Sequence, residues 1–159
     1  MTLLSRKADY ALLILSFLHT HGSGNGREIA AKFGLSRAFV ANILKELGHK
    51  GFVTSTRGVK GGYVLQRASA TITLAELLEA VEDGFQLTLC NEHTGGEATC
   101  DVEHVCPVKA PMLEIQRRIM ALLRGVTLAD IFAPTTGQPV LTTLGFIARP
   151  ISHPESSTA

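Results

Sequence analysis

The segment that most constrains the fold is residues 27–52, REIAAKFGLSRAFVANILKELGHKGF. Its first part predicts a short amphipathic helix with apolar residues at helical spacing, namely Ile29, Ala30 and Phe33. Gly34 then allows a sharp turn, and Ser36 is placed to cap a second helix. The second helix turns four apolar side chains to one face, namely Val40, Ile43, Leu44 and Leu47. Two helices joined by a short turn containing glycine predict a helix-turn-helix.

After Gly51 the periodicity changes. Residues 52–56 and 62–66 are rich in β-branched and aromatic side chains and flank the basic, glycine-rich stretch RGVKGG. They predict a two-stranded hairpin with a turn that glycine permits. A helix-turn-helix followed at once by a basic hairpin is typical of a winged helix.

Two more helices are expected to complete this unit. Ser5 can cap a helix that ends at residues 21–22 and has apolar residues on one face, namely Tyr10, Ile14, Phe17 and Leu18. Thr73 and Glu76 predict a capping box for a helix that closes the domain near Gly84. The apolar positions of that helix are Leu74, Leu77, Leu78 and Val81. The expected fold is therefore mainly α-helical with a small β-hairpin.

The second half of the chain is organised differently. Residues 85–111 show no periodicity, whereas residues 112–124 predict a long helix with a broad apolar face. That face comprises Met112, Ile115, Ile119 and Leu122, widened by Leu113, Met120 and Leu123. It is too broad for one small neighbour, so we expect part of it to pack on a second subunit. The chain then divides into a winged helix (1–84), a cysteine loop (85–111), a dimerisation region with a last helical turn at 127–132 (112–132), and a loose tail (133–159).

The charge distribution points to a polyanionic partner. Residues 1–70 hold ten Lys or Arg and three Asp or Glu, a net charge of +7, while residues 71–159 carry five and eleven, a net charge of −6. The total of +1 excludes a protein that coats nucleic acid through charge alone. A length of 159 residues excludes a large enzyme barrel. A basic half joined to an acidic half indicates a nucleic-acid reader with a separate second function.

The sequence also indicates the cellular location of the protein. No apolar run approaches the roughly 18 to 20 residues that cross a bilayer. Arg6 and Lys7 precede an apolar stretch as in a short signal peptide, but Asp9 and the histidines after the stretch favour an ordinary first helix. Three cysteines are an odd number for a secreted disulfide framework. We therefore expect a cytoplasmic protein.

The predicted second helix carries side chains that suit double-stranded DNA. Arg37 can make a forked contact with guanine, Asn42 has the amide that adenine prefers, and Ser36 can contact phosphate. Ala38 lies on the same exposed face, and Lys32, Lys45 and Lys50 suit phosphates. Arg57 and Lys60 on the hairpin can reach a minor groove or the backbone. Each cation taken singly could simply face solvent; their joint arrangement favours DNA binding.

The cysteines form a second candidate site. Cys90, Cys100 and Cys106 are separated by nine and five residues. Three soft sulfur donors within one loop can hold an iron-sulfur cluster. A structural zinc site would have tighter pairs and four ligands, and three reduced thiols without metal are a further alternative.

These residues resemble the Rrf-two (Rrf2) family of bacterial winged-helix regulators. The similarity rests on SRKADYALLIL, the helix-turn-helix segment, RGVKGGYVL, TLAELLEAVE and the cysteine triplet, over about residues 3–132. It implies a homodimer on a palindromic operator and, in many members, an iron-sulfur cluster on three cysteines. Family members often have five residues in both gaps, so the first gap here is longer.

The resemblance also suggests a fourth cluster ligand. One family pattern places a histidine three residues after the last cysteine, where this chain has Lys109. Another places an aspartate before Tyr-Ala-Leu in the first helix, which Asp9 matches, and there the partner subunit's aspartate completes a four-iron cluster. Asp9 could instead be favoured by the helix dipole, and His93 and His104 remain candidates. A two-iron cluster also remains open.

The expected function is a homodimeric repressor whose operator binding is switched by a cluster that senses nitric oxide, redox state or iron. A cluster-free regulator controlled by thiol oxidation or a partner protein is the alternative. An electron carrier or redox enzyme is disfavoured because the chain has no Walker loop, dinucleotide-binding loop, HExxH or GxSxG motif. We expect no catalytic residues and no small-molecule substrate.

Overall fold

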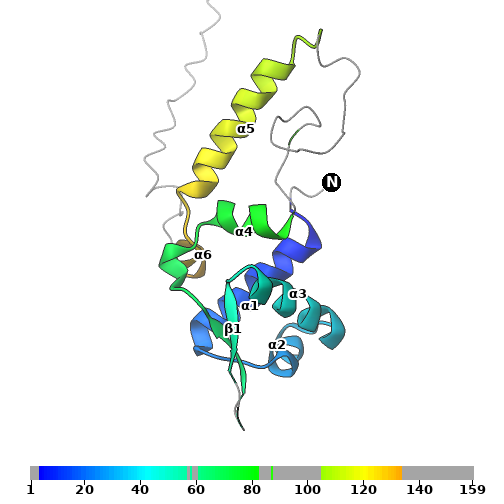
Figure 1. The fold of residues 1–159 in the computed structure, drawn as a ribbon, viewed down its shortest axis with the longest axis vertical. Coiled ribbons are helices and arrows are strands. Elements are labelled where there is room, and N and C mark those ends of the chain that lie inside the picture. Colours follow the sequence, from blue (N-terminus) through cyan, green and yellow to red (C-terminus); the bar gives the residue numbers. More distant parts are fainter. Residues whose placement is uncertain (1–3, 57, 59–60, 83–86, 88–104, 134–159) are drawn as a thin grey trace, which may run out of the picture.

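A computed structural model describes residues 4–56, 58, 61–82, 87 and 105–133. The order of elements is α1 (Arg6–His21), α2 (Gly26–Phe33), α3 (Arg37–His49), β1 (Val53–Thr56), β2 (Gly62–Leu65), the 3-10 turn η1 (Ser69–Thr71), α4 (Leu74–Val81), α5 (Lys109–Arg124) and α6 (Leu128–Phe132). The first seven elements form one body from which α5 projects (Figure 1). The mainly helical fold with one hairpin is as expected.

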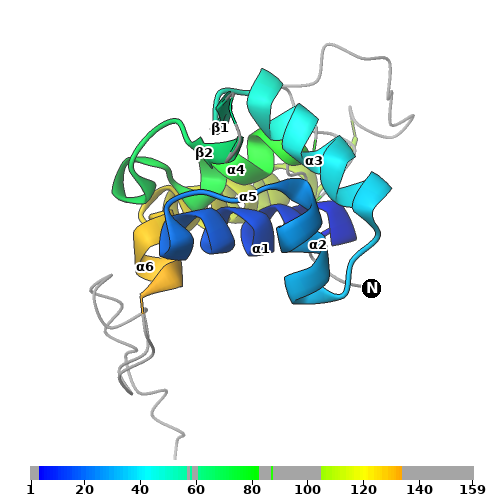
Figure 2. The same ribbon diagram turned by 90° about the horizontal axis from the view of Figure 1, so that it is seen from below.

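Helices α1, α2 and α3 bury most of the apolar positions that the sequence indicated, while Tyr10 and Phe33 are half-buried at the edge of the core. Ser5 caps α1, with its Oγ accepting from the Ala8 N–H at 3.2 Å, and the helix ends at His21 before Gly22. The inner face of α3 is buried at all four expected positions, namely Val40, Ile43, Leu44 and Leu47. Helix α1 packs against both α2 and α3, and Figure 2 shows the three helices together in one part of the molecule. The helix-turn-helix is therefore held on a shared core.

Ser36 differs from its expected role. It occupies the N-cap position of α3, but its side chain makes no capping hydrogen bond. The helix starts here because the backbone of Ser36 is extended and its carbonyl accepts from the Val40 N–H at 3.0 Å. Its exposed hydroxyl is not used to cap the helix.

The hairpin is antiparallel, and each strand is one residue shorter than expected. Val53 pairs with Leu65 and Ser55 with Tyr63. Gly24, in the loop after α1, adds a bridge to Tyr63 through hydrogen bonds of 3.0 and 2.8 Å. A Cβ on Gly62 would lie 2.7 Å from the carbonyl oxygen of Gly24, so this close approach requires glycine. The second glycine of the GGY motif thus anchors the wing to the helical body.

Helix α4 closes the body together with η1 and α6. Thr73 caps α4 as expected, with its hydroxyl accepting from the Glu76 N–H at 3.1 Å. The other half of the expected capping box is missing, because the Glu76 carboxylate pairs with Arg67 at 2.5 Å instead. Backbone bonds from Leu74 to Val126 and from Leu128 to Ile72 tie α6 to this layer.

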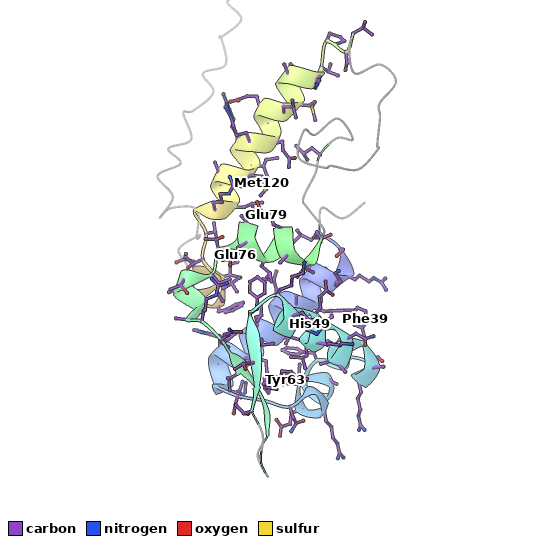
Figure 3. The ribbon with its side chains drawn as sticks, viewed as in Figure 1. Phe39, His49, Tyr63, Glu76, Glu79 and Met120 are labelled. Carbon is purple, nitrogen blue, oxygen red and sulfur yellow. The ribbon has the colours of Figure 1, made fainter. Side chains whose placement is uncertain are left out.

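Helix α5 begins at Lys109, three residues before the expected start. Pro111 did not prevent this, because a helix tolerates proline in its first turn. The C-terminal end of α5 packs on α4, where Arg124 pairs with Glu79 at 3.1 Å, and Met120 is the one buried residue of the helix. Figure 3 shows Met120 and Glu79 at this junction. Further along, Ile115 is 45% exposed in the single chain, while Met112 and Ile119 beside it are half-buried.

Two expected segments fall mostly or wholly on residues that the structure does not describe: the cysteine loop, apart from residues 87 and 105–111, and the tail beyond Ala133. Among the described helices, none is long and apolar enough to cross a membrane.

Candidate DNA-binding surface and cysteine site

The turn between α2 and α3 sets the direction of α3, the helix that the sequence predicts to read DNA and that is called the reading helix below. Gly34 adopts the left-handed conformation at φ 66°, and the next N–H, from Leu35, donates to the Ala30 carbonyl at 2.9 Å. At the other end of α2, Asn25 and Glu28 form a complete capping box. This box was not among the sequence predictions, although the Asn-x-x-Glu pattern is present at residues 25–28. Both ends of α2 are therefore fixed before α3 begins.

One side of α3 is exposed and carries the predicted DNA-contacting residues. These are Ser36, Arg37, Ala38, Asn42 and Lys45. The exposed residues Lys32, at the end of α2, and Lys50, just after α3, flank this set. Arg57 and Lys60 of the wing lie outside the described residues. The helix thus presents polar and basic side chains on the face opposite its buried positions.

Between α3 and the hairpin lies an open groove of about 310 Å³. Its lining residues are Leu44, Lys45, Gly48, His49, Val53, Thr54, Ser55, Tyr63 and Gln66. Of these, only Lys45 was among the predicted DNA contacts. The spacing of His49 four residues after Lys45 could have placed His49 on the same side of the helix, but not the groove itself, which also needs the hairpin.

The metal-site residues are only partly within the described chain. Cys106 has a free, half-buried thiol just before α5, and its carbonyl oxygen lies 3.5 Å from the Lys109 nitrogen, which donates to it. Asp9 is exposed on the first turn of α1. Cys90, Cys100, His93 and His104 lie outside the described residues. Within the part that is described, no three potential metal ligands come together.

The helix that carries Asp9 is joined to the reading helix by two side-chain contacts that sequence analysis did not anticipate. Lys7 Nζ donates to Glu46 Oε1 on α3 at 2.9 Å, and the rings of Tyr10 and Phe39 meet edge to face at 5.2 Å. A third contact reaches α4, where the Ser5 N–H donates to Glu82 Oε1 at 2.8 Å. Asp9 therefore sits on a helical turn that touches both α3 and the end of α4.

A helix-turn-helix with an exposed basic face, followed by a hairpin anchored to the same body, defines the class of winged-helix transcriptional regulators. The family model Rrf2, described as "Iron-dependent Transcriptional regulator", matches residues 4–134. The chain belongs to the Rrf2 family of transcriptional regulators.

Individual relatives agree with this assignment. The chain is 29% identical to Protein aau3 of Rhizobium meliloti over 158 residues, covering 98% of this chain and 99% of that protein. It is 30% identical to the HTH-type transcriptional regulator NsrR of Bacillus licheniformis, covering 80% and 90%. The solved structure of CymR, titled the global cysteine regulator of B. subtilis, matches with a TM-score of 0.64 at 24% identity, covering 83% and 97%. The related regulators are not enzymes.

Proposed function

We propose that this regulator is a homodimeric repressor of a palindromic operator, switched by an iron-sulfur cluster that senses nitric oxide, redox state or iron. Cys90, Cys100 and Cys106 of one subunit would hold the cluster together with Asp9 of the other. The observation that carries the proposal is the direct bonding of the Asp9-bearing turn of α1 to the reading helix α3. In this proposal residues 1–84 read DNA and residues 85–111 bind the cluster. Residues 112–132 form the dimer, and residues 133–159 are a tail.

The exposed face of α3 supports DNA reading. Arg37 and Asn42 stand on the first two turns, where a helix in the major groove meets base edges. Ser36, Lys45 and the wing residues Arg57 and Lys60 would contact phosphates and set the register. Ala38 offers a small side chain that permits close approach to the bases. Together these contacts would let the protein distinguish DNA sequences and bind the negatively charged phosphate backbone.

The donor set fits an iron-sulfur cluster. Thiolates are the usual ligands of such clusters, and the free Cys106 thiol is half-buried, beside a helix start. The carboxylate of Asp9 has no ion-pair or hydrogen-bond partner among the described residues, so it is available as a ligand. When bound, the cluster would supply a centre that is four-iron or two-iron in type and chemically sensitive to nitric oxide, oxygen and iron shortage.

The position of Asp9 explains how such a ligand would affect DNA binding. Restraint of Asp9 fixes the first turn of α1, and this turn holds α3 through Lys7 and Tyr10. Release of Asp9 frees that turn, and the separation of the two reading helices in the dimer changes. A free-energy coupling of about 1 to 3 kcal/mol would alter operator affinity roughly 5- to 150-fold.

Thiol-based control without a metal is the second candidate. It is favoured by the free, half-buried thiol of Cys106. In that case oxidation of the cysteine loop, or a partner protein bound to it, would take the place of cluster loss.

Anaerobic purification followed by spectroscopy tests the proposal. We expect a coloured protein containing iron and acid-labile sulfide, with operator affinity that changes after exposure to nitric oxide or air. Colourless, iron-free protein whose operator binding still responds to thiol oxidants would favour the second candidate. Iron-free protein that binds its operator identically under all conditions would contradict both.

The variant Asp9→Ala tests the ligand role. We expect it to keep operator binding but to lose the difference between the cluster-loaded and cluster-free states. Asp130→Ala, which removes an exposed helix-capping aspartate elsewhere, is the control. An equal response of Asp9→Ala and the parent protein would refute the role of Asp9.

A further inference from the structure

The groove between α3 and the hairpin continues the reading face of the helix. Ala41, Lys45 and His49 follow one another at intervals of four residues and are all exposed. They therefore form one stripe along α3. Lys45 and His49, at its C-terminal end, line the groove opposite Thr54 and Ser55 of β1. The end of α3 lies beside the two strands in Figure 2, and Figure 3 marks His49 on the helix and Tyr63 on the hairpin.

The chemistry of the groove suits an anion. The polar residues that line it are Lys45, His49, Thr54, Ser55, Tyr63 and Gln66. No carboxylate is among the lining residues. The nearest acid along the helix, Glu46, is paired with Lys7 of α1. Polar residues of α3, β1 and β2 thus border one open groove without an acidic residue among them.

We propose that this groove seats a backbone phosphate of the DNA strand that passes between α3 and the wing. The inference rests on the proposed DNA binding. With α3 in the major groove and the wing at the adjacent minor groove, one sugar-phosphate strand separates them and crosses this gap. His49 and Thr54 are then phosphate contacts that hold register, and they read no bases.

The test uses the full-length protein, purified anaerobically, with the operator duplex and a scrambled duplex of equal length. Affinities of His49→Gln and Thr54→Val for both duplexes are measured at one fixed pH and salt concentration. We expect each variant to lose about 2- to 10-fold in affinity for both duplexes alike.

Two controls separate the possible failures. Thr20→Val removes an exposed hydroxyl of α1 that donates to the Ser16 carbonyl at 3.0 Å, and it should bind both duplexes like the parent. Asn42→Ala should lower affinity for the operator alone. If the two groove variants match the parent on both duplexes while Asn42→Ala loses operator preference, the phosphate seat is wrong and base reading by α3 stands. Loss of operator binding alone in His49→Gln would also overturn the seat, and a parent protein that binds neither duplex would overturn DNA binding itself.

Discussion

Lys7 on the first turn of α1 donates a hydrogen bond of 2.9 Å to Glu46 on the reading helix, 39 positions later in the chain. One turn further on, Tyr10 packs edge to face on Phe39 of the same helix. Asp9 lies between these two anchor residues in the sequence. Any restraint on Asp9 therefore acts on a turn that holds α3 at two points.

The first prediction concerns the link from Lys7 to Glu46. Both side chains are about one-third exposed, at 35% and 32%, so Lys7→Gln should cost at most about 1 kcal/mol in unfolding free energy. The ratio of operator affinities before and after nitric oxide treatment should nevertheless fall toward one, because α1 loses one of its two side-chain contacts with α3. Titration of the operator duplex with each form of the protein measures this ratio.

The control for this prediction is Arg67→Gln, which breaks an ion pair of similar exposure between Arg67 and Glu76. That pair involves neither α1 nor α3, so its loss should leave the ratio unchanged. If Lys7→Gln responds to nitric oxide as strongly as Arg67→Gln, the ion pair has no part in the coupling.

The second prediction contrasts two capping positions. Asn25 Oδ1 accepts from the N–H groups of Arg27 and Glu28 at 3.0 and 2.9 Å, so Asn25→Ala should lower the unfolding free energy by about 0.5 to 2 kcal/mol. Ser36 makes no such bond, so Ser36→Ala should cost less than about 0.5 kcal/mol while weakening DNA binding several-fold. Urea unfolding and operator titration measure the two quantities, and equal stability losses would contradict the assignment.

These cases show which features the sequence could reveal. The inner face of α3 and the cap of α1 depend on residues only three or four apart, so their pattern was sufficient. The predicted bond from Glu76 back to Thr73 failed because Arg67, from another segment, competes for the same carboxylate. A pattern of residues three apart cannot show that a residue from another segment will bind the same side chain.

The residues of the candidate site also fall into those that local spacing could place and those that depend on tertiary packing. Arg37, Ala38, Asn42 and Lys45 could be placed on one face by helical periodicity alone. The groove at His49 could not, because it exists only once the hairpin lies against α3. The contact of Lys7 with Glu46 likewise depends on how two helices cross, which the spacing of residues within each helix does not determine.

The third prediction concerns the anchor of the wing. A Cβ at position 62 would approach the Gly24 carbonyl oxygen to 2.7 Å, and backbone cannot yield as a flexible side chain does. Gly62→Ala should therefore lower the unfolding free energy by about 1 to 3 kcal/mol and weaken DNA binding as the wing moves. Chemical denaturation and operator titration measure these effects.

Gly48→Ala is the matched control, because a Cβ there would lie 3.8 Å from the nearest atom, the Val53 carbonyl oxygen. Gly48 lies within α3, so this change should raise stability by about 0.4 to 1 kcal/mol. Destabilisation of both variants to the same extent would contradict the steric argument.

The fourth prediction concerns pH and the cap of α6. The hydroxyl and the N–H of Thr127 both donate to Asp130 Oδ2, at 2.6 and 2.9 Å, and they hold the pKa of this carboxyl below its ordinary value. A carboxyl whose pKa is lowered by folding stabilises the protein above its unfolded pKa and loses that contribution as the pH falls through the folded value. Asp130→Ala should thus be less stable than the parent at pH 7, with a difference that narrows below about pH 4. Denaturation between pH 7 and 3 measures it, and a constant difference would contradict the cause.

The fifth prediction concerns the uncovered face of α5. Ile115 is 45% exposed in the single chain, although the helix carries apolar residues at its neighbouring positions on that side. If this face packs on a second subunit, Ile115→Asn removes apolar burial from both halves of a symmetric interface, at about 1.5 to 3 kcal/mol for each fully buried side chain. The dissociation constant of the dimer should rise at least tenfold, which sedimentation velocity over a concentration series measures. Arg117→Asn, at a position on the opposite side of α5 whose side chain is 71% exposed, should leave the dissociation constant unchanged. A dimer as stable in Ile115→Asn as in the parent would mean that α5 does not form the subunit interface, and Asp9 of one subunit would then need another route to the cysteines of its partner.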